Sequence, residues 1–465
     1  MAQLLEELAR DTRITAIGLH IEGPTDVAAF ARAAEIARQL KKPVIALKTG
    51  RSEQGAKVAM SHTSSLAGAD TLYDALFERY GIARMKSVTS FVETLKFLHH
   101  GGPLPDSRIV SMSCSGGEAA LIADMALERK VSFPPFDPKT KAEVAATLNE
   151  YVSIDNPLDY HTFIWDQFDN LTATYSAVLR GGFDAGVLIL DAPTHKGSNP
   201  AAWIVAAKAY ADAAKMAGAR AVVTASLPEC MLPEVAADLA AKGVAPMMGL
   251  DDTLAAFEAA AFIGKNWARN EVLPALAAPA VTGKGEIMLS EHDAKILLKN
   301  FGLPVPEGRV CKTTEAASVA KQLGFPVTIK TSSSAIAHKT EAGGVALNIK
   351  TVEEAEAVAQ EMAKLAPDVL VERMVTGAVA ELIIGLKNDP QFGLALVIGA
   401  GGILTELLKD SVTLLLPTSR EEVARALKSL KVWKLVEGFR GKSGDQQAVI
   451  AAVLAVADFA KAHRT

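Results

Sequence analysis

Apolar residues in the first hundred positions alternate between short continuous runs and helical spacing. The runs at 14–23 and at Val44–Leu47 end in glycine or polar residues and predict buried strands. Between them, the stretch DVAAFARAAEIARQL (26–40) predicts an amphipathic helix. Because alternating strands and helices favour a parallel sheet with helices on its faces, we expect residues 1–103 to form part of a flavodoxin-like domain.

The same alternation continues through residues 104–265. The stretch SRIVSMSCSGGEAALIADMALERK predicts a strand, a glycine turn and a long helix, and FDAGVLILDAP (183–193) followed by WIVAAKAYADAAKMAG (203–218) repeats strand and helix. We therefore expect a second doubly wound sheet. Residues 266–286 contain two prolines, many alanines and two late glycines, which predict an interdomain linker.

A different α/β pattern fills residues 287–465. It opens with a predicted helix that is capped at Ser290 and stopped by Gly302. Apolar runs at 369–375 and 379–388 predict strands in the second half of the segment. We expect these residues to form a third domain.

The clearest candidate for chemistry is His62, in the stretch AKVAMSHTSSLAGAD (56–70). It lies between a predicted strand and a predicted helix that has Asp70 at a capping position. A helix amino terminus favours anions through its unpaired N–H groups and partial positive charge. Held by the hydroxyls of Ser61 and Thr63, this imidazole is placed to carry a phosphoryl group. The alternative is a structural histidine in a polar loop.

A second small-residue turn, Ser115, Gly116 and Gly117, joins a predicted strand to a predicted helix. Its glycines let backbone N–H groups approach a ligand, so it is a candidate phosphate site. An ordinary strand-to-helix turn is the alternative. Between later elements, NEYVSIDNPLDYHTF is rich in turn formers. It is either a substrate-binding loop, whose candidate residues are Asn156, Asp159 and Tyr160, or a surface turn.

A lysine, spaced acidic residues and glycines recur in the third segment. Lys330 ends a predicted strand, which is how a lysine is fixed to reach nucleotide phosphates. Glu372 and Glu381 lie on two further predicted strands, and Gly401 and Gly402 belong to a glycine loop. Together they predict a nucleotide and magnesium site. Taken singly, each of these residues is equally compatible with a role in the scaffold.

Composition narrows the classes of partner. The chain has 465 residues, 49% of them hydrophobic, and a net charge of −5. With no long basic run, nucleic acid and anionic membranes are unexpected partners. Three cysteines far apart in sequence give neither a disulfide framework nor a zinc pattern. Without a signal peptide or a long apolar span, we expect a cytoplasmic protein.

Several motifs resemble one family. SHTSSLAGAD resembles the phosphohistidine loop of the NDP-forming acyl-CoA synthetases, the superfamily that includes succinyl-CoA synthetase, and IAHKTEAGGVALNI resembles the second histidine loop of their ATP-grasp domain. SCSGGEAAL and NPLDY are similar to elements of the succinyl-CoA-ligase-like domain, and GAGGILTELLKD is similar to the glycine segment of the ATP-grasp part. The resemblance implies flavodoxin-like succinyl-CoA-ligase-type domains followed by an ATP-grasp domain.

The resemblance also implies an activity. ATP with Mg²⁺, a small carboxylic acid and CoA would give an acyl-CoA, ADP and phosphate through an acyl-phosphate. A histidine matching His62 carries the phosphoryl group in related enzymes, and one matching His338 exchanges it with the nucleotide. Glu118 would orient the imidazole. Oligomerisation is expected as well, since a relay between distant sites favours large interfaces.

This chain departs from the family pattern at three places. Ser64 stands where the family usually has glycine. The CoA-binding domain that normally comes first in the family is expected to be missing or to come from a partner subunit. The ATP-grasp domain is expected to be incomplete at its carboxyl end, so no magnesium ligand is named. The alternative function is a catalytically silent fragment or a regulatory module that responds to nucleotide or acyl-CoA.

Overall fold

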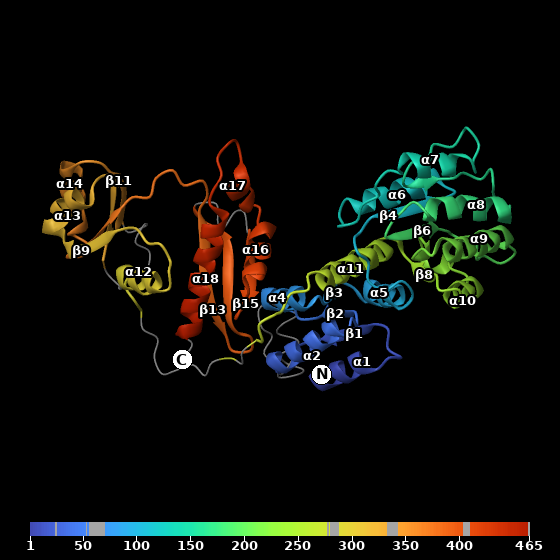
Figure 1. Cartoon of the computed structure of the whole chain (residues 1–465), viewed down its shortest axis with the longest axis horizontal. Coiled ribbons are helices and arrows are strands. Elements are labelled where there is room, and N and C mark those ends of the chain that lie inside the picture. Colours follow the sequence, from blue (N-terminus) through green and yellow to red (C-terminus); the bar gives the residue numbers. More distant parts are fainter. Residues whose placement is uncertain are drawn as a thin grey trace. The chain divides into compact units, whose positions relative to one another are not determined.

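The computed structural model describes residues 1–23, 26–52, 54, 70–276, 279, 288–332, 343–402 and 410–463 (Figure 1). The chain divides into two compact units, Met1–Val272 and Leu273–Thr465. The loop residues Ser61, His62 and Thr63 and the second candidate histidine, His338, lie outside the described residues.

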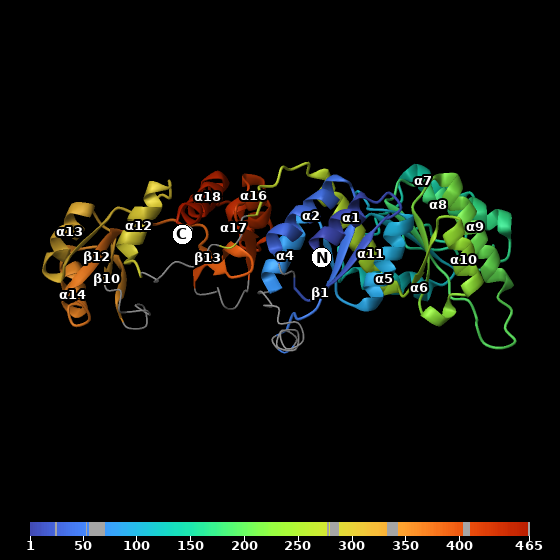
Figure 2. The ribbon, with the colours of Figure 1, turned by 90° about the horizontal axis from the view of Figure 1, so that it is seen from below.

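The first unit begins with a three-stranded parallel sheet in the order β1-β2-β3. Its strands are β1 (Ile17–Ile21), β2 (Val44–Lys48) and β3 (Ala83–Met85). Its helices are α1 (Ala2–Arg10), α2 (Val27–Gln39), α4 (Asp70–Tyr80) and α5 (Val88–His100). Helices α1 and α2 pack side by side (Figure 2). The predicted alternation of strand and helix is confirmed.

The second sheet of this unit has five strands, all parallel, in the order β5-β4-β6-β7-β8. They are β4 (Ile109–Ser113), β5 (Leu158–Asp159), β6 (Ala185–Ile189), β7 (Ala221–Ala225) and β8 (Ala245–Met248). Numbered along the sheet, this is the 2-1-3-4-5 order of flavodoxin-like folds. The predicted doubly wound, flavodoxin-like sheet is therefore confirmed.

Helices flank the five strands, and buried clusters lie on both faces of the sheet. The helices are α6 (Gly116–Ala126), α7 (Pro138–Ala145), α8 (Phe168–Leu179), α9 (Ala201–Ala217), α10 (Pro233–Ala241) and α11 (Leu250–Ala268), with a 3-10 turn at Pro228–Cys230. The predicted linker begins later than expected, because α11 continues to Ala268 and buries Asn266, which donates to the Glu78 carbonyl at 2.9 Å.

The two sheets share one hydrophobic cluster. Ile45 and Ala83 of the first sheet belong to the same buried cluster as Val187 of the second sheet and Leu254 of α11. Helices α5 and α11 pack directly against each other (Figure 1). Consequently residues 1–103 and 104–265, which the sequence analysis treated as two domains, lie within one compact unit.

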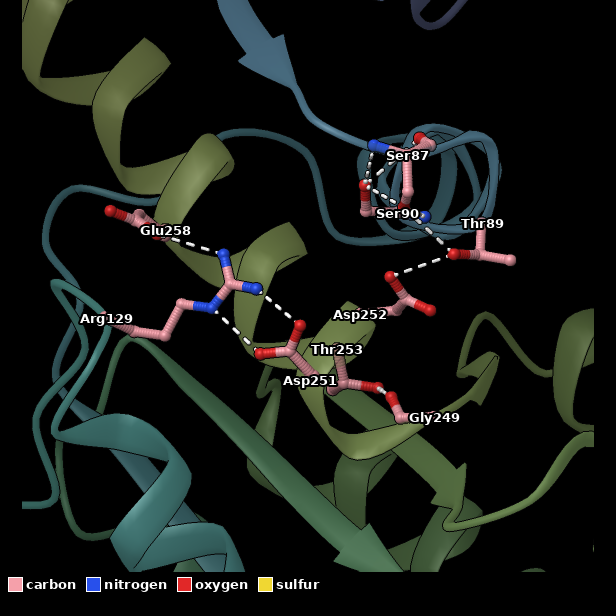
Figure 3. A network of polar contacts seen from close by, with 9 residues as sticks. All are labelled: Ser87, Thr89, Ser90, Arg129, Gly249, Asp251, Asp252, Thr253 and Glu258. Carbon is pink, nitrogen blue, oxygen red and sulfur yellow. Dashed lines mark hydrogen bonds and ion pairs between the residues drawn. The ribbon is translucent and has the colours of Figure 1, made fainter.

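A polar network at the start of α11 adds to this packing (Figure 3). The Arg129 guanidinium donates through Nε and one terminal nitrogen to the Asp251 carboxylate at 3.0 and 2.6 Å. Its other terminal nitrogen lies 3.5 Å from Glu258. The Thr89 hydroxyl, in the first turn of α5, donates to Asp252 at 3.2 Å. The segment after α6 and the beginning of α5 are thus both connected to α11.

The second unit contains two antiparallel sheets with separate buried clusters. The first has the order β11-β10-β12-β9, with β9 (Gly308–Lys312), β10 (Val327–Thr331), β11 (Val345–Ile349) and β12 (Asp368–Arg373). Its helical segments are α12 (Glu291–Asn300), α13 (Ala316–Leu323), α14 (Val352–Met362) and a 3-10 turn at Thr313–Glu315. The predicted cap is confirmed, since Ser290 accepts from the Asp293 N–H at 3.1 Å.

The second sheet of this unit has the order β13-β14-β15. Its strands are β13 (Leu382–Asp389), β14 (Gly393–Ala400) and β15 (Ser411–Leu415), and its helices are α16 (Arg420–Ser429), α17 (Trp433–Gly438) and α18 (Gln446–Ala462). Glu381, expected within a strand, instead immediately precedes β13. Among the described residues, no helix combines the length and the apolar character needed to cross a membrane.

Candidate active site

The turn Ser115–Gly117 lies at the switch point of the five-stranded sheet. From the end of β4 the chain passes to β5 on one side, and β6 then returns to the other side of β4. Ligands of open parallel sheets bind at the carboxyl ends of the strands, where the strand order reverses in this way. The turn directly follows the carboxyl end of β4 and leads into α6. The predicted phosphate-binding turn therefore lies where such a sheet binds ligands.

Local hydrogen bonds fix the geometry of this turn. Ser115 caps α6, and its hydroxyl accepts from the Glu118 N–H at 3.5 Å. The Ser113 hydroxyl accepts from the Ser115 N–H at 2.8 Å and donates to the Glu118 carboxylate at 2.5 Å. Gly116 and Gly117 are exposed. The turn thus presents two glycines to solvent at a helix amino terminus, beside a carboxylate whose orientation is set by Ser113.

The Glu118 carboxyl lies within the electrostatic influence of two further acidic groups at this end of the sheet. Burial raises its pKa, the Ser113 hydrogen bond lowers it in part, and the charges of Asp191 and Asp159 raise it further. Asp191 follows β6 and Asp159 ends β5, so both lie at carboxyl ends of strands next to β4. The raised pKa favours a Glu118 carboxyl that is protonated or that accepts a hydrogen bond from a cationic donor.

Asp159 lies close to the beginning of α6. A Cβ added at Gly116 would lie 3.0 Å from Asp159 Oδ2, whereas one added at Gly117 would meet only Ser115 Oγ, at 3.6 Å. Asp159 Oδ1 accepts from the His161 N–H at 2.9 Å. A side chain at position 116 would therefore crowd this carboxylate, which lies at the end of β5.

Asn156 and Tyr160 do not fit the substrate-binding role expected from the sequence. The Asn156 amide donates to the carbonyls of Ile109 and Pro134, at 2.9 Å each, and accepts from the Ser111 N–H at 3.1 Å. Tyr160 is fully buried, and its hydroxyl accepts from Tyr175 at 2.8 Å. Both side chains are used to hold the segment 156–160 on the sheet, so we assign them to the scaffold.

In the second unit, the candidate nucleotide residues Lys330 and Glu372 lie in direct contact. Strands β10 and β12 pair antiparallel with Thr328 opposite Glu372, so Lys330, two residues further on, shares a sheet face with Glu372. Lys330 Nζ lies 3.2 Å from Glu372 Oε2. Two residues of α12 complete the cluster: Lys330 Nζ also lies 2.5 Å from Glu291 Oε1, and Lys295 Nζ lies 2.9 Å from Glu291 Oε1 and 2.5 Å from Glu372 Oε1.

The cluster holds two positive and two negative charges in alternation. Burial alone would raise the pKa of Glu291, but the hydrogen bonds from Lys330 and Lys295 outweigh it and bring this pKa to about 2. For Lys330, burial lowers the pKa, and the bonds to Glu291 and Glu372 raise it above the ordinary value. Glu291 and Lys330 are therefore both ionised near neutral pH, and Lys330 retains a full positive charge.

The remaining predicted nucleotide residues meet on the other sheet of this unit. The Gly401 N–H donates to the Glu381 carbonyl at 2.7 Å. Gly402 has a φ of +74°, and a Cβ there would lie 2.6 Å from Glu381 Oε2. The positive φ favours glycine at position 402, and the Gly401–Glu381 hydrogen bond continues the antiparallel pairing of β13 with β14. That Glu381, Gly401 and Gly402 contact a nucleotide stays a prediction.

Two parts of the predicted chemistry have no described geometry. Ser61, His62, Thr63 and His338 fall outside the described residues. Among the residues that are described, no group of three or more His, Cys, Asp or Glu side chains could hold a metal ion. We therefore assign no magnesium ligand.

Comparison with known proteins identifies the family. A model of the succinyl-CoA ligase like flavodoxin domain matches residues 1–98, and a model of the ATP-grasp domain matches residues 280–465. The beta subunit of the ADP-forming acetate–CoA ligase II of Pyrococcus furiosus is 36% identical over 187 residues, which cover 38% of this chain and 79% of that subunit. The chain belongs to the family of ADP-forming acyl-CoA ligases.

Another ADP-forming acyl-CoA ligase aligns with nearly all of this chain. The ADP-forming 4-hydroxybutyrate–CoA ligase of Nitrosopumilus maritimus is 28% identical over 463 residues, which cover 94% of this chain and 65% of the relative. The chain therefore spans 65% of that relative's length. The apo dinucleotide forming acetyl-coenzyme A synthetase 1 of Ca. Korarchaeum cryptofilum shares the fold, with a TM-score of 0.50, 23% identity, and coverage of 58% of this chain and 57% of that one.

Three charged groups of these sites, Glu291, Lys295 and Asp191, were not among the residues predicted from the sequence. Glu291 and Lys295 lie four residues apart on a predicted helix, a spacing typical of a solvent-exposed ion pair, and no sequence signal directs them to Lys330. Asp191 was identifiable. It follows a predicted strand, and the carboxyl ends of parallel strands meet at one edge of a sheet.

Proposed function

We propose that this chain carries out the phosphoryl relay of an acid–thiol ligase that forms an acyl-CoA from a small carboxylic acid, CoA and ATP. The γ-phosphoryl group leaves ADP and forms a P–N bond with an imidazole. A carboxylate oxygen then takes the phosphoryl group to give an acyl-phosphate, and the CoA thiol displaces inorganic phosphate from it. In this proposal His62 carries the phosphoryl group, and His338 exchanges it with the nucleotide.

The observation that carries the proposal is the glycine turn before α6, at the switch point of a flavodoxin-like sheet, in a chain that also contains an ATP-grasp domain. The exposed amino terminus of α6 supports a role for Ser115, Gly116 and Gly117 in binding phosphoryl oxygens. Glu118 is oriented by Ser113, which supports its proposed role as acceptor of an imidazole N–H. Asp159 is retained as a candidate for contact with the acid substrate.

On the nucleotide side, Lys330 supplies a fixed positive charge for the phosphates of ATP. Glu372 holds Lys330 in place, and we propose Glu381, Gly401 and Gly402, which lie together at the end of the β13–β14 pair, as a further nucleotide contact. Mg²⁺ bound with the nucleotide would neutralise phosphate charge, and its ligands are unassigned. ATP, ADP and CoA are thus the proposed ligands, together with a small carboxylic acid.

The experiment that tests the proposal is labelling of the chain with γ-³²P-ATP and magnesium. Under the proposal the wild-type chain acquires label that is stable in alkali and labile in acid, as expected for phosphohistidine. His62→Ala should abolish lasting label. His338→Ala should abolish transfer from ATP. Phosphorylation of the histidines needs only residues that we propose in the present chain, so labelling can be measured without CoA or a carboxylic acid.

Three outcomes of that experiment separate the alternatives. Label that persists in His62→Ala refutes the assignment of His62, and label that persists in His338→Ala refutes the assignment of His338. Nucleotide binding without any label in the wild type refutes the relay, and supports a module that responds to nucleotide without catalysis. Acyl-CoA formation on addition of CoA and a panel of small acids then identifies the substrate.

The proposal extends to partners and compartment. One relative is a beta subunit, so a partner subunit, or a further domain that binds CoA, is a proposed component of the active enzyme. We also propose a homo- or hetero-oligomer, for which size measurement with and without the partner is the direct test. All three cysteines are free, which is compatible with the reducing cytoplasm proposed from the sequence.

A further inference from the structure

The four charged groups of the cluster, Lys330, Lys295, Glu291 and Glu372, differ in how firmly each is held. Glu372 is on β12, between β10 and β9, and its side chain is 5% exposed. Glu291 is in the first turn of α12, and its side chain is 31% exposed. Rotation of the Glu291 side chain toward solvent would rehydrate its carboxylate, whereas displacement of Glu372 would leave a carboxylate buried. Glu291 is therefore the partner that Lys330 can exchange at lower cost.

Lys295 keeps the cluster balanced during such an exchange. Its ammonium is 2.5 Å from one Glu372 oxygen, and Lys330 is 3.2 Å from the other. With Lys295 in place, the charge of Glu372 is shared by two lysines. Once Glu291 turns away, two positive charges and one negative charge remain, which leaves a net attraction for an anion beside Lys330. Without Lys295, Glu372 alone would neutralise Lys330.

We propose that Glu291 is the exchangeable counter-ion of Lys330, which the polyphosphate of the nucleotide replaces, and that Lys295 is a positioning residue that keeps Lys330 available by occupying Glu372. This inference rests on the proposed function, because it takes Lys330 as the lysine that contacts nucleotide phosphates. No bond is made or broken in the exchange. One carboxylate is replaced by phosphate oxygens as the hydrogen-bond acceptor of Lys330.

The proposal gives opposite signs for two variants in calorimetric titration with Mg·ADP. Glu291→Gln removes the competing charge, so the dissociation constant should fall about fivefold, the effect of one partly exposed charge-assisted hydrogen bond. Lys295→Met leaves Glu372 to Lys330 alone, so the dissociation constant should rise about fivefold. A merely structural role of Glu291 predicts weaker binding in Glu291→Gln.

Matched variants show whether the effect passes through Lys330. Glu353→Gln removes a carboxylate from the first turn of α14, in the same part of the unit, and should leave the dissociation constant unchanged. Combined with Lys330→Met, Glu291→Gln should no longer tighten binding. Glu291→Asp, which shortens the side chain by one methylene, should tighten binding by a smaller factor and replaces Glu291→Gln if that variant does not fold.

The other possible results of the Mg·ADP titrations overturn the proposed exchange. Unchanged or weaker binding in Glu291→Gln, or tightening that persists without Lys330, overturns the exchange while the proposed function stands, provided the wild type binds Mg·ADP and becomes labelled. Absence of Mg·ADP binding by the wild type overturns the exchange and the proposed function together.

Discussion

Gly264 of α11 is the position at which one methyl group should disturb the first unit most. A Cβ there would lie 2.8 Å from the carbonyl carbon of Leu104 and closer still to its oxygen, whereas ordinary contact begins at 3.4 Å. The obstacle is backbone and not the end of a flexible side chain. Leu104 is fully buried, and its N–H donates to the Ala260 carbonyl at 3.1 Å. Gly264→Ala must therefore move the connection between the two sheets.

The expected cost follows from opposing contributions. Alanine in a helix interior is favoured over glycine by about 0.5–1 kcal/mol. Against this, the Leu104–Ala260 hydrogen bond is worth about 1 kcal/mol, and an overpacked buried contact costs about 1–3 kcal/mol. We expect a net loss of about 2 kcal/mol, which for a unit of this size lowers the melting temperature by about 4–8 °C.

Scanning calorimetry of the whole chain measures this loss. The transition of residues 1–272 should move as one, because both sheets share a core, and the transition of the second unit should stay in place. Gly117→Ala is the matched control, since a Cβ there meets only Ser115 Oγ at 3.6 Å, and it should change stability by less than about 1 kcal/mol. A Gly264→Ala protein as stable as the wild type would refute the reasoning. Separate melting of the two sheets would instead show that they fold independently.

Two further predictions concern the charges of the first unit. Burial raises the pKa of Glu118 in the folded chain, so ionisation of this carboxyl opposes folding. The free energy of unfolding should therefore decline as the pH rises from about 4.5, the ordinary glutamate pKa, through the raised pKa of the folded state. Urea unfolding of Glu118→Gln over the same pH range should show a shallower decline. Arg129→Met removes the contacts to Asp251 and Glu258 and should lower the free energy of unfolding by about 1 kcal/mol, a modest loss because Asp251 is largely exposed. Arg129→Lys should be intermediate in stability between Arg129→Met and the wild type, because it keeps the charge but loses the two-point contact. Equal stability of Arg129→Met and wild type in urea would contradict the second prediction.

Local sequence patterns were sufficient to predict most of the fold. Apolar runs such as Val44–Leu47 became buried strands, and the caps Ser115 and Ser290 mark the expected helix starts. The alternation of strand and helix predicted a parallel sheet, and all five strands of the second sheet are parallel. The predicted boundary at residue 103 did not separate two compact units, because the shared cluster of α5 and α11 is a tertiary feature that no local pattern encodes.

The candidate site divides in the same way. Lys330 and Glu372 were found by residue type and strand position, and their contact follows from the pairing of β10 with β12. Glu291 lies 39 residues before Lys330 in sequence, and Lys295 lies 77 residues before Glu372. Their contacts therefore depend on where α12 packs. Turn composition likewise could not show that Asn156 and Tyr160 point into the scaffold. Residue type therefore predicted the candidates, and only packing decided which of them remain.

The charges at the switch point explain why a histidine suits the proposed relay. Asp159 and Asp191 lie close enough to Glu118 to raise its pKa, and negative charge at this end of the sheet repels a free phosphate even where glycine N–H groups attract it. An imidazole that carries the phosphoryl group brings its own N–H donor, which a carboxylate accepts, and delivers the phosphoryl oxygens to the helix terminus. The acidic surroundings thus favour a phosphoryl group presented on an imidazole over the free anion. Binding of inorganic phosphate should therefore strengthen when Glu118 is replaced by glutamine, whereas phosphohistidine formation should weaken.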